Sequence, residues 1–205
     1  GANLTPLQAR GLALAWVHPL RRCQNSRLEQ WYFDQIEASI QEGAVATEFW
    51  VALLRADSPR IREYLERLML DTSYPEAFRS EAGTIYFERF QPAERLQHYL
   101  RAFETARMPE HVAFGVTQRL LREQPDRLLD NVSRIVRDRP DVADQMAFLT
   151  IAQNSHKHAS DAARDRLAAA LEAALQQGPL PTTGGRRERL NQAAAQLRRR
   201  FSGSR

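Results

Sequence analysis

Several residue types and motifs that often reveal what a protein does are scarce in this chain or missing from it. The 205 residues include one cysteine, Cys23, and one lysine, Lys157. A single cysteine cannot form an internal disulfide, which indicates a reducing compartment or indifference to redox, and we expect a cytoplasmic protein. There is no glycine-rich phosphate loop, no Cys-x-x-Cys pair, no His-Glu-x-x-His and no serine nucleophile between glycines. We therefore expect no cofactor and no metal, and a binding protein rather than an enzyme.

Long apolar runs are missing as well. The most apolar stretch, Leu12–Val17, is short and is followed by His18 and Pro19. A helix that crosses a bilayer needs about 20 apolar residues, so we expect no transmembrane segment. The 28 arginines that accompany the single lysine, together with abundant alanine, are typical of a GC-rich bacterial genome. They predict a bacterial origin.

The net charge of +4 is concentrated at the C-terminal end. Residues 186–205 contain seven arginines and one acid, which gives +6, whereas the rest of the chain contains 22 basic and 24 acidic side chains, which gives −2. A nucleic-acid-binding domain usually spreads positive charge over a folded face. The distribution therefore predicts a basic arm attached to a nearly neutral domain.

Prolines mark two interleaved series of helix starts. The first series is evenly spaced and consists of Pro59, Pro92 and Pro125. The second series has nearly the same spacing and consists of Pro75, Pro109 and Pro140. Proline suits the first turn of a helix because the N–H that it lacks would be unpaired there. A common period of about 33 residues predicts a repeated helix–turn–helix unit.

Apolar residues between these starts recur at the spacing of a buried helix face. The first such set is Ile61, Tyr64, Leu65, Leu68 and Met69. We predict an all-α domain over residues 1–177, regular over about 44–177, with ten helices stacked as antiparallel pairs in a short α-solenoid. The alternative is a closed multi-helix bundle in which Trp16, Trp31 and Trp50 share one core.

The C-terminal region differs in composition. Residues 178–185 contain two prolines and three glycines and predict a linker. Residues 186–205 place Leu190, Ala194, Leu197 and Phe201 on one side of a basic amphipathic helix. This helix either folds back to cap the last helix pair or reaches out to an acidic partner, RNA or an anionic membrane.

Over about residues 44–177, the period and the helix pairing resemble the α-solenoid classes of HEAT, armadillo and tetratricopeptide repeats. Gly83 and Tyr86 are similar to the glycine and tyrosine of a tetratricopeptide first helix. In the next unit, Gly115 is followed by Gln118 at the corresponding place, and the period is short for HEAT repeats. The resemblance implies a curved stack whose surface binds other macromolecules.

These observations predict a non-catalytic scaffold or adaptor, with a protein as the expected partner. The alternative is a nucleic-acid-binding protein that uses arginines of the second helices and the basic tail. The candidate arginines for either partner are Arg62, Arg67, Arg95, Arg101, Arg127, Arg134, Arg186, Arg187, Arg189, Arg198, Arg199 and Arg200. If they pair with nearby acids such as Glu63, Glu94 and Asp130, no basic groove remains. A third hypothesis is an enzyme that resembles the HEAT-like DNA glycosylases, with Trp31, Trp50 and Asp34 as its constellation.

Overall fold

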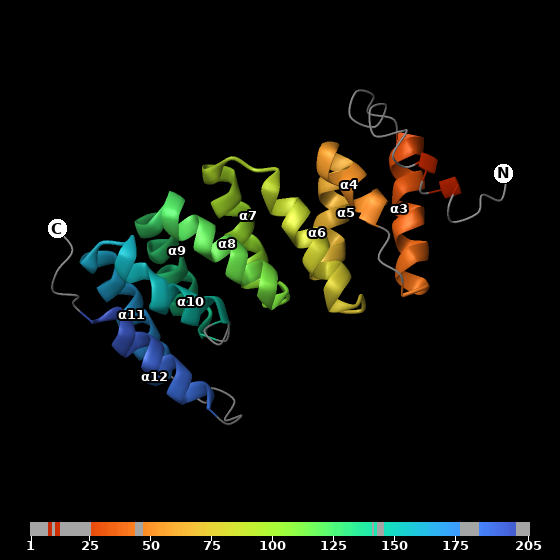
Figure 1. Ribbon diagram of the computed structural model, residues 1–205. Helices are drawn as coiled ribbons and strands as arrows, with labels where there is room; N and C mark the ends of the chain where they lie inside the picture. The colour runs from red at the N-terminus through yellow and green to blue at the C-terminus, as the bar shows by residue number, and fades with distance from the viewer. Residues whose placement is uncertain are drawn as a thin grey trace. The chain divides into compact units, whose positions relative to one another are not determined.

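The computed structural model describes residues 8–9, 11–12, 26–43, 47–140, 142, 146–176 and 185–199, and the structural statements below concern these residues. They form ten α-helices and one short 3-10 helix and no β-strand, which confirms the all-α prediction. The elements, labelled as in Figure 1, are α3 (Ser26–Gln41), α4 (Thr47–Arg55), α5 (Pro59–Leu70), α6 (Glu76–Glu88), α7 (Pro92–Glu104), α8 (Glu110–Glu123), α9 (Pro125–Asp138), α10 (Met146–Asn154), η2 (Ser155–Lys157), α11 (Asp161–Gln176) and α12 (Arg186–Leu197). No helix in the described ranges is long and apolar enough to cross a membrane.

Five of the six predicted proline positions coincide with the starts of α-helices. Three prolines of one series are the first residues of α5, α7 and α9, while Pro75 and Pro109 immediately precede α6 and α8. The start of α5 is capped by Ser58, whose side chain accepts a hydrogen bond of 3.2 Å from the Ile61 N–H. Residue 141 and residues 143–145, which follow Pro140, lie outside the described part of the chain.

The chain divides into two compact units, residues 1–89 and 90–205. In unit 1, α5 and α4 both pack against α6, and α3 packs against α4 and α5 (Figure 1). The core of this unit is largely aromatic. The rings of Trp31 and Phe49 meet edge to face at 5.9 Å, and those of Phe33 and Tyr64 stack at 4.1 Å. Burial raises the pKa of Tyr32, which lies in the same core, to about 12.

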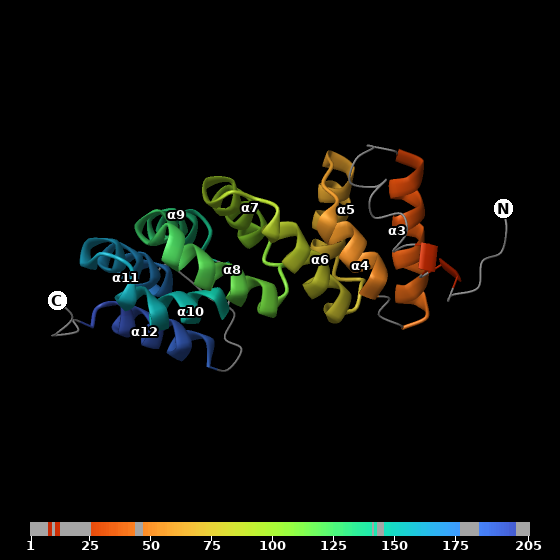
Figure 2. The ribbon, with the colours of Figure 1, turned by 45° about the horizontal axis from the view of Figure 1, so that its top comes forward.

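In unit 2, alternate helices contact one another. Helix α8 packs against α10, and α10 against α12; α7 packs against α9, and α9 against α11 (Figure 2). Much of the buried surface is aliphatic, and α11 contributes Leu167, Ala168 and Leu171 to it. Among the described residues, this unit buries three aromatic side chains and unit 1 buries eight.

Helix α12 folds back onto the rest of unit 2. Leu190, Ala193, Ala194 and Leu197 are buried where α12 packs against α10 and α11. Of the two arrangements that the sequence left open for this helix, this is the one in which it folds back onto the preceding helices. Helix α12 begins after Gly185, whose φ of 85° is a left-handed conformation that glycine adopts without strain. Residues 177–184, most of the predicted linker, lie outside the described part of the chain, as does Phe201.

Candidate macromolecule-binding surfaces

Several of the predicted binding arginines are engaged in ion pairs within their own unit. Arg62 Nε donates to Asp57 Oδ1 at 2.8 Å, and this hydrogen bond is the main reason that the pKa of Asp57 lies below its ordinary value. Arg198 Nε donates to Glu172 Oε1 at 2.8 Å and lowers the pKa of that carboxyl in the same way. These two arginines are therefore already partnered on the surface.

Arg95 is buried rather than exposed. Its side chain is 3% exposed, and its Nη1 donates to Glu123 Oε1 at 2.7 Å, while its Nη2 donates to the Phe90 carbonyl oxygen. The contact connects the start of α7 with the end of α8. Arg95 thus holds two helices of unit 2 together and is not exposed to a binding partner.

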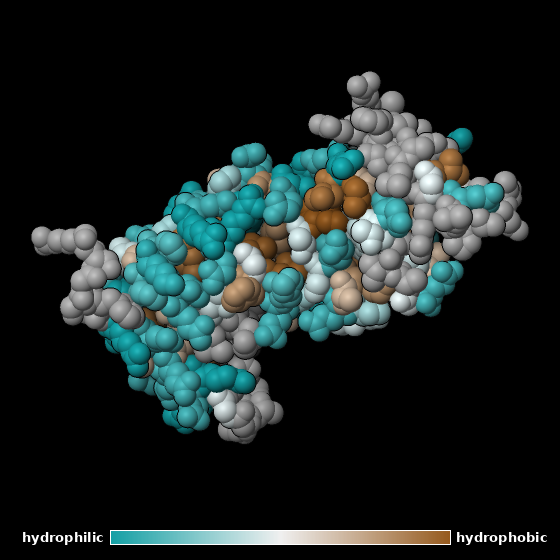
Figure 3. All heavy atoms as spheres, in the orientation of Figure 1, coloured by the Kyte–Doolittle hydropathy of each residue, from teal (hydrophilic) through white to brown (hydrophobic). Residues whose placement is uncertain are grey.

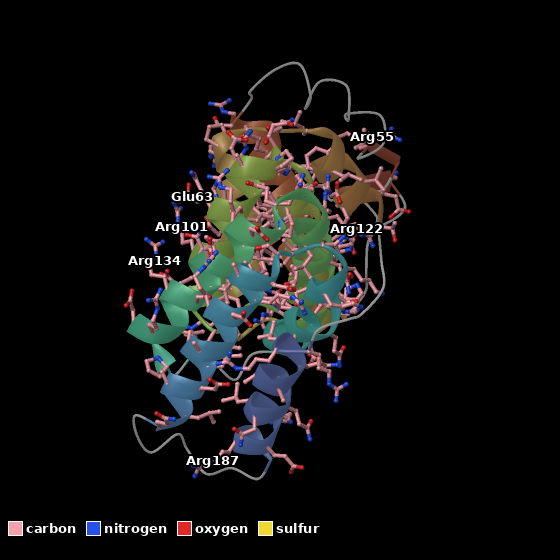
Figure 4. All side chains as sticks on the ribbon, turned by 90° about the vertical axis from the view of Figure 1, so that its left-hand side faces the viewer. Arg55, Glu63, Arg101, Arg122, Arg134 and Arg187 are labelled. Carbon is pink, nitrogen blue, oxygen red and sulfur yellow. The ribbon has the colours of Figure 1, made fainter. Side chains whose placement is uncertain are left out.

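Three other candidates are exposed on α7 and α9, two helices that pack against each other. Arg127 Nη1 donates to Gln124 Oε1 at 3.0 Å and Arg134 Nη2 to Asn131 Oδ1 at 3.1 Å, so both keep their charge without a carboxylate partner. Arg101 is also exposed and has no carboxylate partner within the described part of the chain. Figure 4 shows Arg101 and Arg134 projecting from the same side of unit 2. We call Arg101, Arg127 and Arg134 the arginine face.

Acidic residues are interspersed with the arginine face. Glu94 and Glu104 are exposed on α7, and Asp138 is exposed on α9. Asp130, also on α9, is paired with Arg166 of α11 at 2.8 Å between Nε and Oδ1. The exposed surface of α7 and α9 is consequently of mixed charge and does not form a uniformly basic stripe.

The arginines of α12 face different surroundings. Arg187, Arg189 and Arg199 are exposed, and the Arg199 carbonyl oxygen accepts a hydrogen bond of 2.9 Å from buried Arg164. Arg200 and the side chain of Arg186 lie outside the described part of the structure. The C-terminal helix therefore serves as a packing element of unit 2 that also carries basic side chains on its exposed face.

Two large apolar side chains are exposed on helices of different units. Leu54 of α4 and Phe114 of α8 each retain 50% of their surface. Figure 3 shows apolar surface around α4 among mostly polar neighbours. On α8, His111 and Gly115 are exposed beside Phe114. Single exposed apolar residues are common on protein surfaces, so neither residue alone defines a binding patch.

A cavity of about 250 Å³ lies in unit 1 between α3 and α5. Its walls include the stacked rings of Phe33 and Tyr64. The guanidinium of Arg60 lies 6.0 Å from the centre of the Phe33 ring, and that of Arg67 lies 5.4 Å from the centre of the Tyr64 ring. Burial, reinforced by the negative charge of Glu37, raises the pKa of Tyr64 above its ordinary value. Of the predicted arginines, Arg67 therefore lines this cavity.

The residues of the glycosylase hypothesis are not brought together as a stacking surface. Trp50 is 2% exposed and belongs to the core of unit 1, and Trp31 packs against Phe49. Asp34 is exposed at the cavity between α3 and α5. A flipped base needs exposed aromatic faces on which to stack, and Trp50 offers none. Within the described part of the chain, no group of three or more His, Cys, Asp or Glu residues could hold a metal ion.

Two contacts made by buried charged side chains, Glu29 and Arg89, were not foreseen from the sequence. Glu29 is buried on α3 and lies 3.4 Å from Arg60 Nη1, 31 residues later. Arg89 reaches back 33 residues to the Ala56 carbonyl oxygen and also bonds the Leu53 carbonyl oxygen at the end of α4. Both contacts span about one period of the proline series. A search for opposite charges at that separation would have found the first of them.

No family model matches this chain, and no curated protein and no solved structure match it.

Proposed function

We propose that this protein is a non-catalytic scaffold that binds another protein, with its helices stacked as a short α-solenoid. The observation that carries the proposal is the arginine face: exposed guanidinium groups on two packed helices, with amide rather than carboxylate partners. Unpaired arginine is a frequent anchor in protein interfaces because its planar group makes several hydrogen bonds at once. The partner is expected to present carboxylates to this face.

Contacts at a nearly constant separation support the stacked arrangement. In unit 2, Gln124 Nε2 donates to the Pro92 carbonyl oxygen, 32 residues earlier, at 2.6 Å. The Ser160 N–H donates to Asp126 Oδ1, 34 residues earlier, at 2.8 Å. Each contact connects a position with its counterpart about one proline period away, which is the pattern of a stack in which each unit touches its neighbour. Stacks of this kind expose extended binding surfaces.

The mixed charge around the arginine face favours a protein over a nucleic acid. Residues 90–185 contain 12 basic and 12 acidic side chains, so unit 2 is neutral before α12. Phosphate backbones are bound by surfaces with a clear excess of positive charge, whereas protein interfaces combine both signs. Glu94, Glu104 and Asp138 would repel a nucleic acid from the same helices.

The binding proposal is tested with two fluorescent probes, a peptide of alternating glutamate and glycine and a single-stranded oligonucleotide, by anisotropy at low and physiological salt. Replacing both Arg101 and Arg134 with alanine should weaken binding of the acidic peptide by about tenfold or more, because two charge-assisted hydrogen bonds are lost. Arg122→Ala is the matched control, since Arg122 is exposed on α8 and Figure 4 shows it on the other side of unit 2. It should leave binding unchanged.

Two outcomes would contradict this proposal. Preferential binding of the oligonucleotide, lost in the same double variant, would support the nucleic-acid alternative. Equal effects of the double variant and Arg122→Ala would show that binding does not use the arginine face.

The stacked arrangement has its own test, because a closed bundle of this length has a radius of gyration of about 17 Å and an open stack a larger one. X-ray scattering from the whole chain measures this radius.

A further inference from the structure

The cavity between α3 and α5 in unit 1 has the properties of a site for a positively charged side chain. We propose that it binds the guanidinium group of an arginine from a partner polypeptide. This inference goes beyond the proposed function because it concerns another unit and the opposite charge, and it does not depend on the arginine face.

The two helices contribute matching sets of residues to the cavity. Each supplies four side chains at positions i, i+3, i+4 and i+7, which for α3 are Gln30, Phe33, Asp34 and Glu37. These positions share one face of a helix and extend over about 10 Å. The cavity is therefore built from the facing sides of two regular helices, which hold its wall in place.

The charges of the cavity do not cancel. Arg60 is held by Glu29, outside the cavity lining, and by the Gln30 oxygen at 3.1 Å. Arg67 has Glu37 as its nearest acid, at 3.8 Å, and Glu37 Oε1 also accepts a hydrogen bond of 3.1 Å from the Tyr74 hydroxyl. Both resident arginines are thus matched by a carboxylate of their own.

Two carboxylates remain. Asp34 and Glu63 are exposed at the cavity, and Asp34 Oδ1 accepts only the neutral amide of Gln30, at 2.9 Å. No cation within the described part of the chain forms an ion pair with either of them. An anionic ligand would be repelled by this pair, and a cationic ligand would be attracted.

The size and polar groups of the cavity favour a single guanidinium. A volume of about 250 Å³ is below the roughly 300–1,000 Å³ of sites for drug-sized molecules, so it suits one side chain. The buried hydroxyl of Tyr64, in the cavity wall, has no hydrogen-bond partner among the described residues. A guanidinium has five donors in a planar fork and can serve both carboxylates and this oxygen. An ammonium group has three donors and is more strongly hydrated.

The inference is tested by titrating the isotope-labelled full chain with N-acetylarginine N-methylamide and following the backbone amide signals. We expect shifts confined to residues 30–37 and 60–67. The corresponding citrulline compound is a neutral analogue of the same size and should bind about tenfold more weakly or worse, because it lacks the charge. The isosteric double variant Asp34→Asn and Glu63→Gln should weaken binding of the arginine compound by a similar factor. Glu81→Gln, at an exposed position of α6 in the same unit, should not.

Three results would overturn the inference. Equal binding of the arginine and citrulline compounds would show that charge is not recognised. Shifts of equal size in the double variant, with its amide spectrum otherwise that of a folded chain, would place the ligand elsewhere. Tighter binding of free L-arginine than of the blocked compound would show that the site recognises the amino acid itself and not a side chain of a polypeptide.

Discussion

Units 1 and 2 use different chemistry to connect positions that lie about one proline period apart. In unit 1, the side chain of Arg89 is 4% exposed and donates to the carbonyl oxygens of Leu53 and Ala56, 36 and 33 residues earlier. In unit 2, the corresponding separation of 36 residues is bridged by Arg166 and Asp130, both of which are about half exposed. The spacing is common to both units, but one contact is buried and directed at the backbone, and the other is a surface ion pair.

The two units also differ in the types of residue that they contain and bury. All three tryptophans and four of the five tyrosines lie in residues 1–89, whereas α11 and α12 of unit 2 bury mainly leucine and alanine. The net charge also differs, at −2 for residues 1–89 and +6 for residues 90–205. In both units, contacts connect positions about one proline period apart, but different side chains make these contacts. We therefore expect the units to respond differently to the same kind of mutation.

The largest effect is expected from removing a large aromatic side chain from unit 1. Trp50→Ala should lower the free energy of unfolding by about 3–5 kcal/mol, because a buried ring is replaced by a cavity. Since every tryptophan lies in unit 1, fluorescence reports on that unit, while far-UV circular dichroism reports on both. In a urea titration, the fluorescence midpoint should fall and a second, later step should remain in the dichroism.

The matched variant in unit 2 is Leu171→Ala, at a fully buried position of α11. It should lower the dichroism midpoint with little change in fluorescence. If both variants shift both signals together, the two units unfold as one. The units then have no separate free energies of unfolding to compare.

The next effect concerns the aliphatic part of the core of unit 2. Leu100 of α7 is half-buried, whereas Leu96 on the same helix is buried. Leu96→Ala should therefore cost about 2–5 kcal/mol and Leu100→Ala distinctly less. Arg101→Ala should change stability by less than about 0.5 kcal/mol. Thermal melts of the three variants test this order, and equal costs at Leu96 and Leu100 would contradict the assigned burial.

A smaller effect on stability is expected when either of the two contacts that span one period is removed. Arg89→Met keeps the apolar stem of the side chain but removes the donor to the Ala56 carbonyl oxygen and one of the two donors to the Leu53 carbonyl oxygen, which should cost about 1–3 kcal/mol. Arg166→Met breaks an exposed ion pair and should cost at most about 1 kcal/mol. Urea titrations of both variants measure the difference. A larger cost for Arg166→Met would reverse the assignment of which contact is structural.

The helix starts could be predicted from the sequence because they depend on local chemistry. Proline fixes φ and lacks an N–H wherever it occurs, so Pro59 and Pro92 mark first turns without reference to the rest of the fold. The burial of Arg95 could not be predicted in this way. It depends on Glu123, 28 residues later, and on the approach of α8 to α7, which the sequence of α7 does not contain.

The candidate site was predictable to a similar extent. Exposure of Arg101 and Arg134 follows from their polar positions on amphipathic helices, because the opposite face carries the apolar residues. The cavity of unit 1 was not foreseen. Its residues lie on two helices, and Asp34 and Glu63 come together only when α3 packs against α5. Sequence patterns within one helix give its buried face but not the neighbour that the face meets.

The smallest effect is the pH dependence of the surface ion pair in unit 1. The pKa of Asp57 lies below its ordinary value of 3.8, chiefly because of the hydrogen bond from Arg62, with the charge of Arg89 adding to it. A carboxyl whose pKa is lowered by folding stabilises the protein above its ordinary pKa, and this contribution is lost as the pH falls through the folded value. Because Asp57 is 43% exposed, the contribution should be below about 1 kcal/mol.

Asp57→Asn should therefore lower the unfolding free energy at neutral pH, by fluorescence-detected urea titration, and the gap from the original protein should close below pH 3.8. Glu172→Gln, which removes the partner of Arg198 in unit 2, should leave the fluorescence transition unchanged at every pH, because the tryptophans lie in the other unit. A gap for Asp57→Asn that persists at low pH would mean that the loss comes from packing and not from charge. Since Arg89 contacts Asp57 as well as the end of α4, a persistent gap would also assign the aspartate a part in positioning that buried arginine.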